Sequence, residues 1–131
     1  MIEYRIESSL HLMQAHITGS VHFLDLVNFV TRLRKDPQWG PAVGSLLLIE
    51  EAAVVDKVEP GSLRSLFHKI GEEGGSGRWA IVSTNKDHTL RFHGAVEGFH
   101  SAGLQIRVFE DELLALGWLR SDQKTTASMA G

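Results

Sequence analysis

The sequence contains no cysteine. Without cysteine the chain can form neither disulfides nor thiolate metal sites, and it has no cysteine nucleophile. No apolar run approaches the roughly 20 residues that a membrane helix needs. The N-terminal stretch MIEYRIESSL is charged from Glu3 onward and lacks the apolar core of a signal peptide. We therefore expect a cytoplasmic protein without a membrane span.

An excess of positive charge is also missing. The formal net charge is -3, which gives no basic footprint and predicts no nucleic-acid partner. A length of 131 residues, with 43% hydrophobic and 22% charged residues, is typical of one soluble globular domain. We expect a single domain over residues 1–119 and a polar C-terminal tail over residues 120–131.

The first part of the chain predicts a hairpin followed by a helix. Residues 2–6 and 10–18 alternate apolar and polar side chains, and the connection between them is short, so the two strands should pair antiparallel. Ser20 is placed to cap an amphipathic helix, which ends in basic residues before Asp36. Trp39 lies in the loop that follows and could take part in a homodimer contact.

The stretch over residues 44–61 is the expected centre of the fold. Ser45 to Ile49 shows no alternation, which indicates a strand covered on both faces by helices. An acidic loop follows, and Pro60 stands where the first turn of a helix tolerates proline.

Two further strand–helix units complete the chain. The strands are expected at residues 79–83 and 104–109, and the helices at residues 85–102 and 110–119. Asn85 or Asp87 can cap the third helix, and Gly103 is a natural stop. The last helix carries an apolar stripe, which predicts core packing more often than an interface: Leu113, Leu114, Leu116 and Trp118.

This order predicts an α/β fold with a mostly parallel sheet of about five strands, flanked by about four helices. In such sheets ligands usually sit outside the carboxyl ends of the strands. Three valines in the loop after the central strand look exposed and favour contact with a partner. The candidate ligand or partner surface comprises Glu50, Glu51, Val54, Val55, Asp56, Val58, Ser62, Ser83, Thr84 and Asn85.

The sequence shows no catalytic constellation. The carboxylates of the acidic loop have no nucleophile paired with them, and the serines lack the context of a nucleophile elbow. His93, Glu97 and His100 are four and three residues apart, so one helix face could offer them to a divalent metal. A solvated face or partner surface explains this spacing more often. We expect no catalytic residue, no metal and no cofactor.

The chain resembles the SpoIIAA-like family within the STAS clan over residues 1–119. The family closes with a valine–phenylalanine strand end, an acidic pair, an alanine and a tryptophan–leucine. The matching residues are Val108-Phe109, Glu110-Asp111, Ala115 and Trp118-Leu119, together with the Asp36-Pro37 loop and the strand at Leu46 to Ile49. The resemblance implies a STAS-type fold, in which a mixed sheet has one antiparallel edge strand.

STAS relatives are mostly regulatory or binding modules, among them anti-sigma-factor antagonists. Their switch is an aspartate followed by serines and a glycine, and phosphorylation of a serine breaks the partner complex. Asp56 matches the aspartate, but Lys57 and Val58 occupy the serine positions and Glu59 the glycine. Ser62 is the nearest hydroxyl. The resemblance thus implies a regulatory domain without the serine phosphoswitch.

Two functions remain open. The first is a non-enzymatic protein-interaction domain with an unidentified protein partner, in which aspartate at positions 55 and 58 should abolish the contact. The second is a domain that binds a small, apolar ligand, because lipid-binding CRAL-TRIO domains have a related topology. That alternative predicts a pocket lined by residues 50–59 and 83–88. Small domains of this kind often pair, so we also expect a homodimer.

Overall fold

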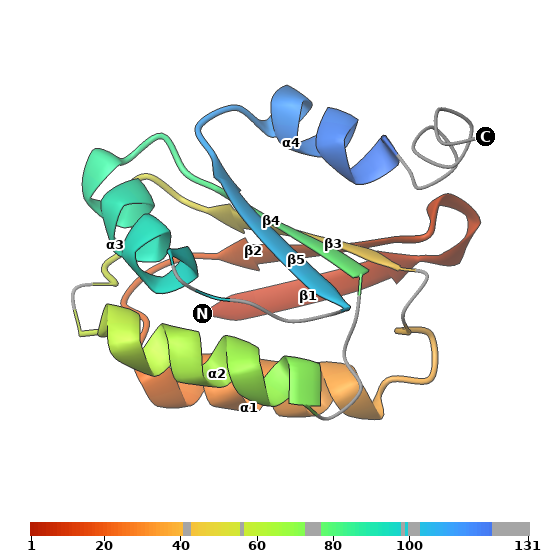
Figure 1. Ribbon diagram of the computed structural model, residues 1–131, viewed down its shortest axis with the longest axis horizontal. Helices are drawn as coiled ribbons and strands as arrows, with labels where there is room; N and C mark the ends of the chain where they lie inside the picture. The colour runs from red at the N-terminus through yellow and green to blue at the C-terminus, as the bar shows by residue number, and fades with distance from the viewer. Residues whose placement is uncertain (41–42, 56, 73–76, 98, 100–102, 122–131) are drawn as a thin grey trace.

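The computed structural model describes residues 1–40, 43–55, 57–72, 77–97, 99 and 103–121. Within these residues, five strands form one sheet and four α-helices flank it (Figure 1). The strands are β1 (Ile2–Glu7), β2 (Leu12–Ile17), β3 (Gly44–Ile49), β4 (Gly77–Val82) and β5 (Leu104–Phe109). The helices are α1 (Phe23–Lys35), α2 (Pro60–Glu72), α3 (Lys86–Val96) and α4 (Glu112–Arg120), and a 3-10 turn, η1 (Ser8–Leu10), joins β1 to β2.

The strands lie side by side in the order of the sequence, β1-β2-β3-β4-β5. β1 pairs antiparallel with β2, and all other neighbours are parallel, which confirms the predicted mostly parallel sheet with its antiparallel edge. From β2 to β5, each parallel strand lies on the same side of the strand before it. Right-handed crossovers therefore place α1, α2 and α3 on one face of the sheet. The last helix, α4, covers the opposite face (Figure 1).

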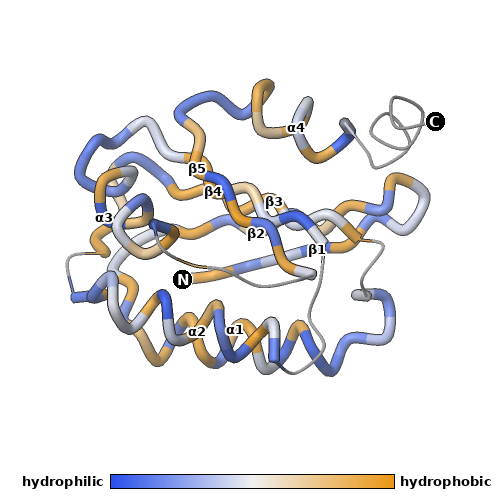
Figure 2. The backbone as a smooth tube through the Cα atoms, in the orientation of Figure 1, coloured by the Kyte–Doolittle hydropathy of each residue, from blue (hydrophilic) through white to orange (hydrophobic). Residues whose placement is uncertain are grey.

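The core has two parts, one on each face of the sheet. The larger cluster lies between the sheet and α1 to α3, and the smaller one lies under α4. Helices α1 and α2 alternate hydrophobic and hydrophilic residues along their length (Figure 2), as expected of helices with one buried side. β3 contributes to both clusters, since Leu47 and Ile49 belong to the larger and Leu46 to the smaller. This explains its lack of alternation.

The hairpin between β1 and β2 differs from the prediction at its turn. Residues 8–10 form η1, and His11 follows with φ 50°, a left-handed conformation that a strand residue does not adopt. β2 therefore begins at Leu12 instead of Leu10. Its predicted alternation is confirmed, because Met13, Ala15 and Ile17 are buried in the larger cluster.

Several element ends also differ from the prediction. Ser20 does not cap α1. It pairs with Val54 in an isolated bridge, and the helix begins after His22, whose N–H donates to Asp25 Oδ2 at 2.8 Å.

β4 covers Gly77–Val82 instead of 79–83. α3 ends at Val96, because ψ of the following residue, 125°, leaves helical geometry. α4 begins two residues late, because Asp111 acts as its cap and accepts from the N–H of Leu113 at 2.8 Å.

The expectation that the whole apolar stripe of α4 is core is wrong. Leu113 and Leu114 are exposed, at 77% and 64%, whereas Ala115 is buried against the sheet. A nine-residue helix that touches the sheet on one side buries only one row of residues, and the two leucines lie outside that row. At the other end of α4, the guanidinium of Arg78 donates to the Trp118 carbonyl oxygen at 2.7 Å and also to Ser121.

Trp39 is half-buried and is engaged within the domain. Its ring meets that of Trp79 edge to face, with centroids 6.3 Å apart, and its Nε1–H donates to Ser45 Oγ at 3.4 Å. Because these contacts use the indole N–H and part of the ring, only the exposed part of Trp39 is left for the expected dimer contact. None of the described helices is long and apolar enough to cross a bilayer.

Candidate functional site

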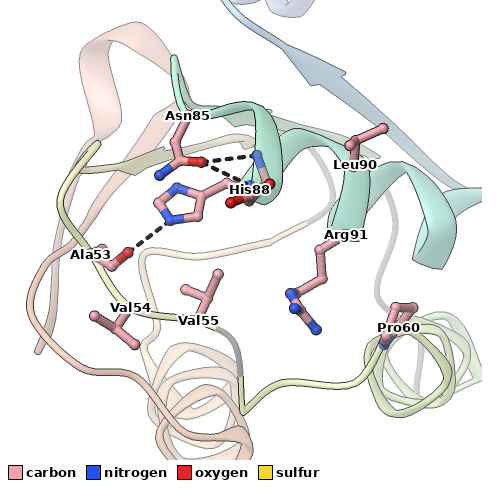
Figure 3. A pocket seen from close by; sticks show the side chains of 9 residues that line it. Ala53, Val54, Val55, Pro60, Asn85, His88, Leu90 and Arg91 are labelled. Carbon is pink, nitrogen blue, oxygen red and sulfur yellow. Dashed lines mark hydrogen bonds between the residues drawn. The ribbon is translucent and has the colours of Figure 1, made fainter.

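An open hollow of about 610 Å³ lies at the carboxyl ends of β3 and β4. One wall is the loop that follows β3, and the other is the first half of α3 (Figure 3). Its position agrees with the predicted edge of the sheet. The lining residues are Ala53, Val54, Val55, Pro60, Asn85, Asp87, His88, Leu90 and Arg91.

The loop wall is held in an extended conformation by backbone pairing. The N–H of Val54 donates to the Gly19 carbonyl oxygen at 2.8 Å, and the Val54 carbonyl accepts from the N–H of Val21 at 2.8 Å. In an extended segment successive side chains point to opposite sides. Val54 is consequently 46% exposed, whereas Ala53 and Val55 are buried.

The expectation that all three loop valines are exposed is therefore wrong for two of them. Val55 and Val58 belong to the larger core cluster, and Val58 is 0% exposed. A backbone bond from the N–H of Val58 to the Val55 carbonyl oxygen, 3.0 Å long, turns the loop back toward the core. These two valines anchor the loop, and only Val54 remains for contact.

The helix wall begins at Asn85, one of the two predicted caps. Its Oδ1 accepts from the N–H of Asp87 at 2.9 Å and from that of His88 at 3.4 Å. Its Nδ2 donates to the Glu51 carbonyl oxygen at 3.0 Å. One side chain thus caps α3 and ties the helix to the loop after β3.

His88 forms a buried brace beneath the hollow. His88 is 3% exposed, and its Nε2 lies 2.7 Å from the Ala53 carbonyl oxygen (Figure 3). Because a carbonyl oxygen only accepts, Nε2 carries the proton, and in the neutral ring Nδ1 accepts from the Ser83 hydroxyl at 2.8 Å. Ser83 Oγ also accepts from the N–H of Asn85 at 3.1 Å. The brace joins the end of β4, the start of α3 and the loop.

The Ser83–His88 pair has the residue types of a nucleophile and its base, but its placement opposes that role. Ser83 is 3% exposed and does not line the hollow, so a substrate there has no access to its hydroxyl. The Nε2–H of His88 is committed to a carbonyl group instead of a carboxylate that would orient a base. The pair is a structural connection.

Arg91 is the cation in the lining. Its guanidinium is half-buried and donates to the Val58 carbonyl oxygen at 2.9 Å, which links α3 to the loop. Asp87, four residues earlier on the same helix, is exposed. The hollow therefore combines apolar walls with one inner cation and one outer anion.

The predicted site residues do not all line the hollow. Val54, Val55 and Asn85 line the hollow. Glu50, Glu51 and Thr84 are exposed near it without lining it, Ser62 is half-buried in α2, and Val58 and Ser83 are buried. Asp56 lies outside the described residues.

The predicted contact surface omitted His88, which falls within the range 83–88 of the predicted ligand pocket, and neither prediction included Pro60, Leu90 or Arg91. The signal for His88 and Arg91 was their spacing of three along a helix that starts at the carboxyl end of a strand. Leu90 could have been noticed as a leucine outside the apolar stripe of α3.

The described part of the chain contains no candidate metal site. There, no group of three or more histidine, aspartate and glutamate side chains gathers as metal ligands would. α3 ends at Val96, so Glu97 is already outside the helix, and His100 lies outside the described residues. The expected common face of His93, Glu97 and His100 is therefore wrong as a continuous helical face.

Comparison of the chain with protein-family models, with curated protein sequences and with solved structures finds no match.

Proposed function

We propose that this chain is a non-enzymatic regulatory or protein-interaction domain whose contact surface is the hollow between the loop after β3 and α3. The resemblance to the SpoIIAA-like family supports a regulatory role. The proposal assigns no reaction, because the hydroxyl and imidazole of Ser83 and His88 are used in buried hydrogen bonds.

One observation carries the proposal: two apolar side chains from different elements stay exposed on the same hollow. Val54 is 46% and Leu90 is 69% exposed, although both line a concave surface. Binding sites are typically concave and lined mainly by apolar side chains with a few polar groups, as this hollow is. The buried brace of His88 fixes the two walls, so little conformational entropy remains to be lost when a partner binds.

A photo-crosslinking amino acid at position 90 tests the proposal in cells that express the chain. Leu10 is the matched control, because it is 56% exposed and lies at the other end of the sheet. It comes just before β2, and the first residue of β2 pairs with Gly44, at the end of β3 opposite the hollow. Crosslinking at position 90 should give discrete protein adducts that a Val54→Asp change weakens, and position 10 should not give them. Identical adduct patterns at the two positions would refute the proposal.

The volume of the hollow supports a second function, the binding of a small apolar ligand. Ligand sites commonly enclose about 300 to 1,000 Å³, and this hollow of about 610 Å³ has lining residues from both predicted loops. Native mass spectrometry of the chain purified from its own host tests this alternative. A co-purifying small molecule that is lost on Leu90→Asp and kept on Leu10→Asp supports it. A bare mass for the unaltered chain opposes it.

A homodimer remains a further proposal, supported by the frequent pairing of small domains of this kind. Light scattering of the purified chain across a hundredfold range of concentration decides it. A constant monomer mass would rule it out over that range.

A further inference from the structure

The inner side of the hollow carries a positive charge. The guanidinium of Arg91 extends between Val55 and Pro60 (Figure 3), and its Nη1–H donates to the Val58 carbonyl oxygen at 2.9 Å. This contact orients the group and uses one of its five N–H donors. In the described part of the chain, Arg91 has no ion-pair partner. A half-buried arginine whose remaining donors have no partner among the described residues is well suited to a carboxylate.

The outer side carries the opposite charge. Asp87 lies one helical turn before Arg91 and is exposed, so water and salt screen its field more than that of the half-buried cation. A single carboxylate that reaches Arg91 gains more from the cation than it loses to Asp87. A second negative charge at the mouth meets Asp87, and the described lining residues include no second cation.

We propose that the partner segment bound in the hollow carries one carboxylate side chain flanked by apolar side chains. The carboxylate pairs with Arg91, and the apolar neighbours contact Val54 and Leu90. A run of acidic residues is disfavoured by Asp87. This inference rests on the proposed protein-interaction function and specifies the chemistry of the partner.

Three capped tripeptides provide the probes: an aspartate between two leucines, and the same peptide with asparagine or lysine in the middle. Each is titrated into the full chain, and binding is followed by the amide NMR signals of residues 53–55 and 85–91. The aspartate peptide should shift these signals and bind about tenfold more tightly than the asparagine peptide. The lysine peptide should bind most weakly. Raising the salt from about 20 to 300 mM should weaken the aspartate peptide alone.

Two charge variants of the hollow have opposite expected effects. Arg91→Gln should lower the affinity for the aspartate peptide about tenfold, whereas Asp87→Asn should raise it about two- to threefold. The asparagine peptide is the internal control, because its affinity should change less than twofold in both variants. If Arg91→Gln disturbs the loop, the asparagine peptide reports it, and the salt dependence of the unaltered chain still tests the carboxylate.

The outcomes separate this inference from the proposed function. Equal affinities for the aspartate and asparagine peptides overturn the carboxylate preference, and if Leu90→Asp weakens both, the hollow remains a binding surface. Octanoate is the probe for a small apolar acid. If it binds more tightly than the aspartate peptide and loses as much affinity on Arg91→Gln, the carboxylate belongs to a small apolar acid and the proposed protein segment is wrong. If no probe shifts these signals at millimolar concentration, the inference is wrong, and the crosslinking experiment still decides the proposed function.

Discussion

The brace of His88 should account for a measurable part of the free energy of unfolding. His88→Ala removes the ring and leaves the Ala53 carbonyl oxygen and the Ser83 hydroxyl without this partner in a buried place. Each unsatisfied buried polar group costs about 1 to 3 kcal/mol. Water can enter from the adjacent hollow and recover part of this, so we expect a loss of about 2 to 4 kcal/mol in urea unfolding monitored by circular dichroism.

The same helix provides a matched control. His93 is exposed on α3, and His93→Ala should change the free energy of unfolding by less than about 0.5 kcal/mol. A double-mutant cycle with Ser83→Ala isolates the bond between the two side chains, and the double variant should lose about 1 kcal/mol less than the sum of the single variants. If His88→Ala costs no more than His93→Ala, or if the cycle is additive, the brace is not stabilising and this reasoning is wrong.

Three further predictions concern other parts of the fold. Val58→Asp buries a charge in the core and should lower the free energy of unfolding in urea by at least about 3 kcal/mol. Val54→Asp should lower the same free energy by less than about 1 kcal/mol, because Val54 is already exposed. Burial, with the hydrogen bond from Tyr4 to Asp36 (2.9 Å), raises the pKa of the Tyr4 phenol above 10.0. Stability from this group is full below pH 10.0, is lost as the pH rises through the raised pKa, and should show no such loss in Tyr4→Phe. Because Tyr4 is the single tyrosine, its ionisation can be followed directly near 295 nm, and a midpoint at or below pH 10.0 would contradict the shift. Arg78→Ala removes the donor to the carboxyl end of α4 and should speed amide hydrogen exchange there severalfold while leaving α1 unchanged.

The architecture could be predicted because each element carries its own periodicity. Alternation in β1 and β2, the unbroken apolar run of β3 and the helical stripe of α2 are local patterns, and the burial of these elements follows them. Element ends were less predictable. They depend on single conformations, such as the left-handed His11 that delays β2. A single sequence does not distinguish such a residue from an ordinary strand residue.

The location of the hollow was predictable, and six of its nine lining residues lie within the two predicted loop ranges. The rule that ligands sit at the carboxyl ends of parallel strands identified both loops. It did not identify Leu90 and Arg91, because they lie one to two turns inside α3 and reach the hollow only through the packing of that helix against the loop. The role of His88 as a brace was not predictable, because its partners Ser83 and Ala53 come from two different loops.

The loop after β3 shows why a contact surface and a structural anchor must be separated before a binding test is designed. Pairing with the Gly19–Val21 segment makes the loop alternate, so it directs Val54 outward and Val55 inward, and Val58 then closes the core. A variant with aspartate at positions 55 and 58 would lose binding by unfolding, whatever the role of the loop, because each change buries a charge. Val54→Asp and Leu90→Asp add charges to side chains that are already in water, so the fold should tolerate them. Loss of a partner in these variants, with unchanged urea unfolding, therefore reports contact at the hollow itself.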